Sequence, residues 1–323
     1  MTAGMRARFW GTRGSLPTPL GAAAVRAKLR DALLAASGRS FASAAEAERF
    51  IDHELPFSLA GTFGGNSSCV EIEFDGAEHV LCDLGSGARV FGHHMLAKHG
   101  PARGQIYDVF LSHLHWDHIM GFPFFAPAYI PGNTIRLHGC HRLMRDAFER
   151  QQSYPCFPVE LAKLGATIEF VELEPGRRYD VAGASVVPIE QNHAGRSYGY
   201  RFERAGRSVV YTTDCEHKFE TLDEKYPFID FFRDADLVIF DAMYSLADAM
   251  SVKEDWGHSS NIVGVELAQM AGVKHLVLFH HEPVYDDVMI AQVLDETRRY
   301  AEISRPGTGL RISSAYDGLE IAV

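Results

Sequence analysis

One short segment constrains this chain more than any other, because four metal-capable side chains occur within six positions. The segment reads Ser-His-Leu-His-Trp-Asp-His over residues 112–118 and directly follows an apolar run that is predicted to be a strand. His113 and His115 are two positions apart, so they project to the same side if the strand continues. Asp117 and His118 begin a turn that can aim at a second ion. The spacing therefore indicates two adjacent metal ions. Exposed polar residues at a strand end are the alternative.

The remainder of the sequence is typical of a globular α/β protein. Apolar residues make up 46% of the 323 positions, and no internal repeat or low-complexity linker divides them, so we expect one domain over residues 1–323. Strands are predicted at residues 6–10, 68–74, 79–84, 107–112, 167–173, 184–190, 198–203, 208–213, 236–240 and 275–279. Strands 167–173 and 184–190 are expected to pair, and a hairpin is expected to close the chain. Helices are predicted at 90–99, 261–271 and 288–304, and two more form a helical insertion at about residues 21–60.

Charge and hydropathy argue against several classes of partner. Lys and Arg total 31 against 42 Asp and Glu, and the net charge of −11 repels a phosphate backbone, so nucleic acid is not an expected partner. No apolar run approaches the roughly 18 residues of a membrane span, and Arg6 and Arg8 stand where a secretion signal needs an apolar core. The sequence therefore predicts a cytoplasmic protein without a membrane partner. Five cysteines without a Cys-x-x-Cys pair indicate reduced thiols.

Further metal-capable side chains follow later strands of the prediction. They are His193, Asp214, His258 and His280. Open α/β sheets collect their ligands at strand ends, so we expect these side chains to approach the histidine-rich segment. A single histidine beside a strand is more often packed or solvated than bound to a metal. The order of all these residues along the chain is therefore more informative than any one of them.

That order resembles the metallo-β-lactamase superfamily. The pattern is His-x-His-x-Asp-His at 113–118, then His193, Asp214 and a strand-terminal His280, with Asp83 in an earlier Leu-Cys-Asp-Leu-Gly motif. The Phe-Trp-Gly-Thr-Arg-Gly-Ser opening at 9–15, the Gly-Gly-Asn-Ser-Ser-Cys loop at 64–69 and Gly-His-Ser-Ser at 257–260 are similar to the phosphodiesterase branch, which includes ribonuclease Z and cyclic phosphodiesterases. The resemblance implies an α/β fold, a four-layer αββα sandwich with two divalent metal ions at one edge.

The resemblance also implies a ligand set. The first ion would be held by His113, His115 and His193, the second by Asp117, His118 and His280, and Asp214 would bridge the two. Imidazole and carboxylate ligands suit zinc, with manganese, iron or nickel as alternatives. Asp117 also counts among the catalytic residues.

Two pairs of neighbouring residues require a choice. Adjacent residues of an extended strand face opposite sides, so only one of Asp214 and Cys215 can face the metals. The phosphodiesterase resemblance favours Asp214 and leaves Cys215 as a small buried side chain, which argues against β-lactamase activity. The family motif places its last ligand directly after the apolar strand, so we choose His280 and interpret His281 as an outer or solvated group.

The resemblance also suggests residues around the metals. His258 is expected to assist departure of the alkoxide leaving group, unless it is only the neighbour of a helix cap. Asp83 is expected to orient a metal-bound imidazole, with a strand-end turn as the alternative. Asn66, Arg196 and Tyr198 are further predictions for contacts with the substrate phosphate, with a surface charge as the alternative for Arg196. Aromatic residues at 121–129 could line the pocket, although such a cluster is more often core.

These residues predict a dinuclear metal hydrolase, in first place a phosphodiesterase that cleaves a small or cyclic phosphodiester by attack of a metal-bridged hydroxide. A tRNA 3′-processing endonuclease, a thioester or lactone hydrolase and a non-catalytic binding protein are the alternatives on the same fold. The acidic charge and the lack of a long basic, Gly-rich insertion argue against tRNA. The sequence is silent on oligomeric state, and a homodimer stays open.

Overall fold

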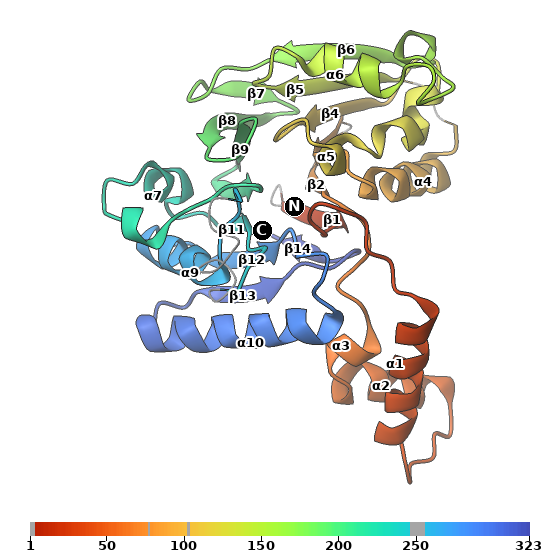
Figure 1. Cartoon of the computed structure of the whole chain (residues 1–323), viewed down its shortest axis with the longest axis vertical. Coiled ribbons are helices and arrows are strands. Elements are labelled where there is room, and N and C mark those ends of the chain that lie inside the picture. The colour runs from red at the N-terminus through yellow and green to blue at the C-terminus, as the bar shows by residue number, and fades with distance from the viewer. Residues whose placement is uncertain (1–3, 77, 102–103, 246–255) are drawn as a thin grey trace.

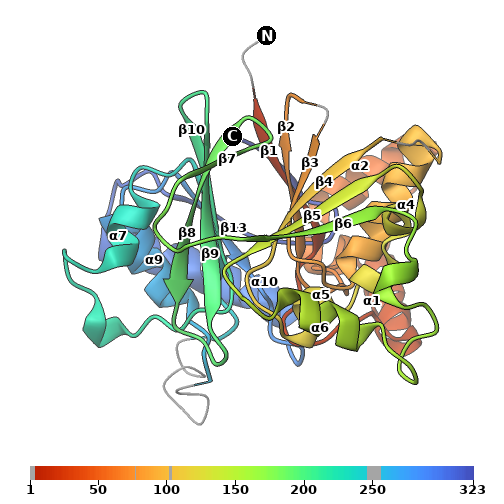
Figure 2. The ribbon, with the colours of Figure 1, turned by 90° about the horizontal axis from the view of Figure 1, so that it is seen from above.

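Two mixed β-sheets face each other at the centre of the molecule (Figure 2). The computed structural model describes residues 4–76, 78–101, 104–245 and 256–323. The first sheet has the order β14-β1-β2-β3-β4-β5-β6 and the second β13-β12-β11-β10-β9-β8-β7. The strands of the first sheet are β1 (Met5–Gly11), β2 (Cys69–Phe74), β3 (Glu78–Cys82), β4 (Ile106–Phe110), β5 (Thr134–Gly139), β6 (Thr167–Glu172) and β14 (Glu320–Ala322). Those of the second are β7 (Tyr179–Val181), β8 (Ala184–Gln191), β9 (Ser197–Arg204), β10 (Arg207–Thr212), β11 (Leu237–Asp241), β12 (His275–Phe279) and β13 (Arg311–Ser314).

Helices cover the outer face of each sheet, and the four-layer αββα prediction is confirmed. The first sheet is covered by α4 (Gly87–His99), α5 (Trp116–Ile119) and α6 (Met144–Gln151), and the second by α7 (Pro227–Phe232), α9 (Asn261–Met270) and α10 (Asp287–Ser304) (Figure 2). No helix among the described residues is long and apolar enough to cross a membrane.

Strand β11 shows how the sequence fills both faces of a sheet. Leu237 and Ile239 belong to the core between the two sheets, whereas Val238 and Phe240 belong to the core under the helices. A strand that is buried on both faces needs a continuous apolar run instead of alternation. Each such side chain contributes roughly 1.5–3 kcal/mol when fully buried. In β11 the polar group, Asp241, therefore comes at the end of the strand.

Three helices occupy the region of the predicted insertion and project from the body of the molecule (Figure 1). They are α1 (Ala22–Ala35), α2 (Ala44–Glu54) and α3 (Phe57–Ala60), one helix more than predicted. The Ser43 side chain caps α2 by accepting a hydrogen bond from the Glu46 amide (3.3 Å). The ammonium of Lys28 on α1 lies 2.6 Å from the buried carboxylate of Asp287, which ties the insertion to α10.

Two predictions of strand pairing were wrong. The predicted partners 167–173 and 184–190 lie in different sheets, because β6 pairs with β5 while β8 pairs with β7 and β9. The chain crosses between the sheets after β6, so consecutive strands are not neighbours. The last two strands do not form a hairpin, since β13 pairs with β12 and β14 pairs with β1. Strand β5 and helix α6 were not predicted.

Candidate functional site

The polar residues that follow the buried strands meet at one edge of the sandwich. Parallel neighbours β3 and β4 end at this edge, as do β10, β11 and β12. The residues that follow these strands and β8 are Asp83, the segment 113–118, His193, Asp214 and His280, and Asp241 is the last residue of β11. Because the carboxyl ends of parallel strands share an edge, residues as far apart in the sequence as Asp117 and His280, 163 positions, become neighbours.

Three of these residues share a left-handed backbone conformation, which directs their side chains toward the site at this edge of the sandwich. Asp83, Asp214 and His280 have φ values of 61°, 50° and 62°. Left-handed backbone costs a residue with a Cβ roughly 1–2 kcal/mol, so it persists only where the surroundings hold it. Each of the three follows a buried strand, and the sharp turn directs its side chain toward the other site residues.

A first group contains three imidazoles. Ligand atoms of His113, His115 and His193 lie within 4.8 Å of one another. Nε2 of His193 is 3.2 Å from Nδ1 of His115. One carboxylate oxygen of Asp214, Oδ2, lies 3.7 Å from Nε2 of His113 and 3.7 Å from Nε2 of His193.

A second group is buried beside the first and includes the other oxygen of Asp214. Its members are Asp117, His118, Asp214 and His280. Oδ1 of Asp214 lies 3.1 Å from Nε2 of His118 and 3.2 Å from Nε2 of His280. Asp214 thus presents one oxygen to each group, which is the geometry of a carboxylate that can bridge two cations.

Hydrogen bonds to residues around the two groups determine which nitrogen of an imidazole is available to bind a metal. Nδ1 of His118 donates to Asp83 (2.8 Å), and Nδ1 of His193 donates to the carbonyl of Gly257 (2.8 Å). Asp83 is held in turn by the Tyr211 hydroxyl and the Ser112 amide, both at 2.7 Å. A ring that donates through Nδ1 offers the lone pair of Nε2 to a ligand.

The chemistry of both groups fits divalent cations. Nε2 of His113 and of His118 is buried and makes no hydrogen bond of acceptable geometry within the part of the chain that the structure describes, although carboxylate oxygens lie 3.1 Å from Nε2 of His118. Burial lowers the pKa of His113, which favours the neutral, metal-binding imidazole. Burial alone lowers the pKa of His118 too, but the carboxylates of Asp117 and Asp214 outweigh it and raise that pKa, so the second group attracts positive charge. Nitrogen and carboxylate ligands suit zinc and its neighbours in the first transition series.

His258 lies next to both groups and is hydrogen-bonded to the carboxylate of Asp241. Its Nδ1 lies 2.8 Å from Oδ2 of Asp241, and its side chain is 9% exposed. Burial by itself lowers the pKa of His258, but the negative charges of Asp241, then Asp214 and Asp117, raise that pKa to about 9. The carboxylates around the ring, Asp241 above all, therefore favour its protonated form. The neighbouring Ser260 caps α9 by accepting from the Val263 amide (3.3 Å).

Asp241 was missed by the sequence reasoning, although a signal for it existed. It ends the apolar run of β11, in the same position relative to its strand as the residues that were singled out. Besides His258, its carboxylate accepts from the amides of Cys215 (3.2 Å) and Met243 (3.1 Å). Asp241 therefore joins the loops that follow β10 and β11 to the histidine.

The structure separates the members of the two ambiguous pairs. Asp214 lies among the imidazoles, whereas Sγ of Cys215 is buried 3.9 Å from Nδ1 of His217, outside both groups. His280 belongs to the second group, while Nε2 of His281 lies 2.8 Å from the carbonyl of Ala315. His281 is 4% exposed, so of the two interpretations, an outer group or a solvated group, the solvated one was wrong.

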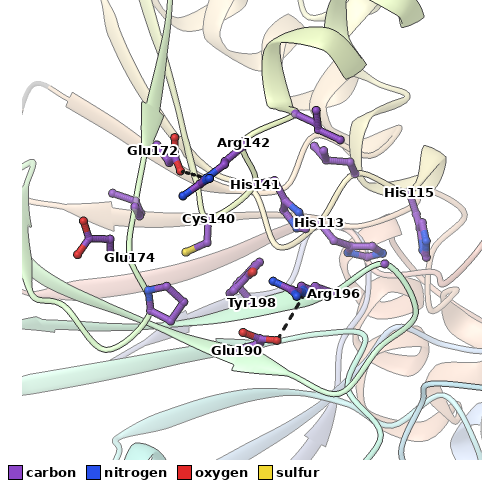
Figure 3. A pocket seen from close by; sticks show the side chains of 15 residues that line it. His113, His115, Cys140, His141, Arg142, Glu172, Glu174, Glu190, Arg196 and Tyr198 are labelled. Carbon is purple, nitrogen blue, oxygen red and sulfur yellow. Dashed lines mark hydrogen bonds and ion pairs between the residues drawn. The ribbon is translucent and has the colours of Figure 1, made fainter.

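The three predicted substrate contacts lie in two different places. Asn66 donates to Asp317 (2.9 Å) and accepts from Ser86 (3.1 Å), so its side chain is occupied within the loops that support the site. Arg196 and Tyr198 line a pocket that opens beside the first group (Figure 3).

The aromatic run at 121–129 is mostly part of the protein core. Phe122 and Phe125 are fully buried in the cluster between the first sheet and its helices. Phe124 is 57% exposed. The pocket beside the first group is lined by other residues.

Replacing Gly257 with alanine is expected to weaken metal binding about 10–100-fold, the usual cost of disturbing an outer partner of a ligand. Gly257 has φ +84°, and an added Cβ would overlap with Nδ1 of His193, which donates to the Gly257 carbonyl. Titration of metal into the apo protein measures the change. Gly206→Ala is the matched control, because Gly206 has φ +76° and open space around it. Equal metal affinity in both variants would contradict this role.

Known proteins resemble this chain in sequence and in fold. Residues 78–281 match the family described as the beta-lactamase superfamily domain. The chain is 26% identical over 285 residues to a protein of Pseudomonas putida (strain W619) named Ribonuclease Z, a match that covers 75% of this chain and 86% of the relative. The metallo-beta-lactamase fold protein YhfI from Bacillus subtilis superposes with a TM-score of 0.63 at 17% identity, over 99% of this chain and 100% of YhfI. The structure of unliganded yeast PDE1 superposes with a TM-score of 0.65 at 14% identity, over 99% of this chain and 100% of the PDE1 chain. Both structural likenesses show the fold.

Proposed function

The chain belongs to the metallo-β-lactamase superfamily and is a metal-dependent hydrolase, and on this basis we propose that it hydrolyses a small phosphodiester. The observation that carries the proposal is the His258–Asp241 pair beside the two ligand groups. An alkyl phosphodiester expels an alkoxide, which is a poor leaving group unless it is protonated as the bond breaks. A thioester expels a thiolate, a more stable leaving group that needs no such proton. A lactone also expels an alkoxide, so the substrate comparison below is what separates a lactone hydrolase from a phosphodiesterase.

Seven side chains would hold two divalent cations in this proposal. They are His113, His115 and His193 for one, Asp117, His118 and His280 for the other, and Asp214 for both. Two such cations supply Lewis acidity and lower the pKa of a bound water.

The other residues position groups and hold protons. Asp83 and the Gly257 carbonyl keep the imidazoles of His118 and His193 in one tautomer and orientation. Asp241 retains the proton on Nδ1 of His258, so the proton on Nε2 is the one that is given to the leaving oxygen. The same carboxylate stabilises the imidazolium before that transfer.

An RNA substrate is the second candidate, and the relative named Ribonuclease Z favours it. Electrostatics favours the small diester. The net charge is −11, and the insertion at residues 22–60 carries five basic and five acidic residues, so it offers no excess of cations to a phosphate backbone. Affinity for RNA should fall steeply with salt if RNA is the substrate, because each phosphate contact releases counterions.

A substrate comparison tests the proposal. The zinc- or manganese-loaded chain is expected to hydrolyse bis(p-nitrophenyl) phosphate and a cyclic nucleotide with kcat/KM values about tenfold or more above those for a thioester, a lactone and precursor tRNA. Removal of the metal by a chelator should abolish the activity, and readdition should restore it. The highest kcat/KM on precursor tRNA, with a steep salt dependence, would establish the RNA alternative, and the highest on the thioester or lactone would overturn phosphodiester hydrolysis.

A further inference from the structure

A pocket of about 680 Å³ opens beside the first imidazole group and has no role in the chemistry described above. Figure 3 shows His113 and His115 on one side of it and Glu172 and Glu174 on the other, with Cys140 and other side chains between. Pockets that hold small organic ligands have volumes of roughly 300–1,000 Å³. The pocket is therefore large enough for a substituent that is attached to a phosphate at the metal ligands.

The inner walls of the pocket are uncharged. Tyr198 is 3% exposed, and burial raises the pKa of its hydroxyl, which stays protonated. Its ring lies edge-on to that of His141, with 5.0 Å between the centroids, and burial lowers the pKa of His141. Burial, with Glu190 and Glu172 nearby, raises the pKa of the Cys140 thiol to about 12. These walls offer apolar contact and neutral hydrogen-bonding groups.

The arginine and glutamate side chains of the pocket lining each have an ion-pair partner. Nε of Arg142 lies 3.2 Å from Glu172, and Nε of Arg196 lies 3.9 Å from Glu190 (Figure 3). Glu174 adds a further carboxylate, and its own partner is Arg177 at 3.5 Å. Both guanidinium groups of the lining thus face a carboxylate. A phosphate that entered here would have to share each guanidinium with a carboxylate and would lie close to that negative charge.

We propose that this pocket binds one uncharged, hydrogen-bonding substituent of the phosphodiester, about the size of a nucleoside, and that Glu172 and Glu190 reject substrates with a second phosphate at this place. The inference rests on the proposed function and narrows it. It makes the two carboxylates determinants of specificity, and it separates a single small diester from a polynucleotide, whose next phosphate would meet them.

Three esters with the same nitrophenolate leaving group test the inference. They are methyl p-nitrophenyl phosphate, thymidine 5′-(p-nitrophenyl phosphate) and the latter ester with an added 3′-phosphate. The kcat/KM of the wild type is expected to be about tenfold or more higher for the thymidine ester than for either of the others, because only this ester fills the pocket without a second charge. In calorimetry, thymidine 5′-monophosphate should bind about tenfold more tightly than thymidine 3′,5′-bisphosphate, which gives a readout that does not depend on turnover.

Two variants locate the effect in the pocket. Glu172→Gln with Glu190→Gln frees both guanidinium groups, so the kcat/KM ratio of the 3′-phosphorylated to the plain thymidine ester should rise about tenfold. Glu149→Gln is the matched control, since Glu149 makes an exposed ion pair with Arg145 (3.7 Å) outside the pocket, and it should leave the ratio unchanged. Cys140→Phe fills the pocket and should lower the preference for thymidine over methyl ester.

The outcomes separate this inference from the function on which it rests. Equal kcat/KM values for the methyl and thymidine esters, or a ratio that the double variant does not move, would overturn the pocket assignment and leave phosphodiester hydrolysis intact. Failure to hydrolyse any of the three esters, with hydrolysis of a thioester, would overturn the proposed function and the inference with it.

Discussion

Replacing His258 with alanine is expected to leave both metal ions bound and to lower the rate on an alkyl or cyclic phosphodiester about 10²–10⁴-fold, the usual contribution of a general acid. The loss on a nitrophenyl diester should be much smaller, because nitrophenolate is a stable leaving group that needs little protonation. The expected result is therefore a difference between substrates. The measurements are kcat/KM for both substrates, the metal content and the thermal unfolding of each protein.

The geometry explains why His258 is the residue for this test. Asp241 lies 2.8 Å from Nδ1, so the side chain is oriented and its positive charge is stabilised without the metals. His258 also lies close to His193 and Asp214, with one ligand atom of each residue within 4.8 Å of the others. Equal losses on both substrates would mean that His258 binds the phosphate instead of donating a proton. No loss on either substrate would make it a bystander beside the cap of α9.

The site could be predicted from the sequence wherever a residue type and a strand end coincide. The segment 113–118 follows a strong apolar strand, and His193, Asp214 and His280 follow later strands that β-propensity makes visible. Asp241 meets the same criterion, but a single acidic residue before Ala242 and Met243 carries no pattern of its own. Its role becomes visible only when the fold brings it to His258.

Backbone conformation could not be predicted at the same residues. The sequence argument for Asp214 assumed an extended strand, in which alternate residues face opposite sides. In the structure Asp214 lies beyond the end of β10 and has a φ of 50°. The direction of its carboxylate therefore depends on this turn as well as on the strand. Left-handed conformation is rare for residues with a Cβ, so a single sequence gives no reason to expect it.

Strand pairing depends on where the chain changes sheets, which local patterns do not encode. Residues 167–172 and 184–191 have the composition of strands, and they are separated by the short strand β7. A hairpin is the simplest arrangement for strands this close in sequence, but the chain passes from the first sheet to the second between them. Strand β5 was missed because only Ile135 and Leu137 carry its alternation of apolar and polar residues, a pattern too short to stand out. His138 is nevertheless buried, and its Nε2 lies 2.7 Å from the carboxylate of Asp108, which compensates the burial of both polar groups.

Replacing Asp214 with asparagine is expected to reduce the metal content from two ions per chain to one or none. The two oxygens of Asp214 face different imidazole groups, at 3.7 Å from His113 and 3.1 Å from His118. Asparagine would turn an amide N–H toward one of the groups and would remove the negative charge that offsets two neighbouring cations. The loss of affinity should exceed the 10–100-fold that is typical of an outer partner. Elemental analysis after reconstitution measures it.

Cys215→Ser is the matched control for Asp214→Asn, because the two residues are adjacent in the chain and both are buried. The thiol lies 3.9 Å from His217 and outside both ligand groups, so its replacement should retain both ions and change only the stability of the fold. Cys215→Ala removes the polar atom altogether and should behave in the same way. Loss of a metal ion from the cysteine variants, with two ions retained by Asp214→Asn, would mean that the thiol is the ligand and would revive a β-lactamase-like arrangement of the site.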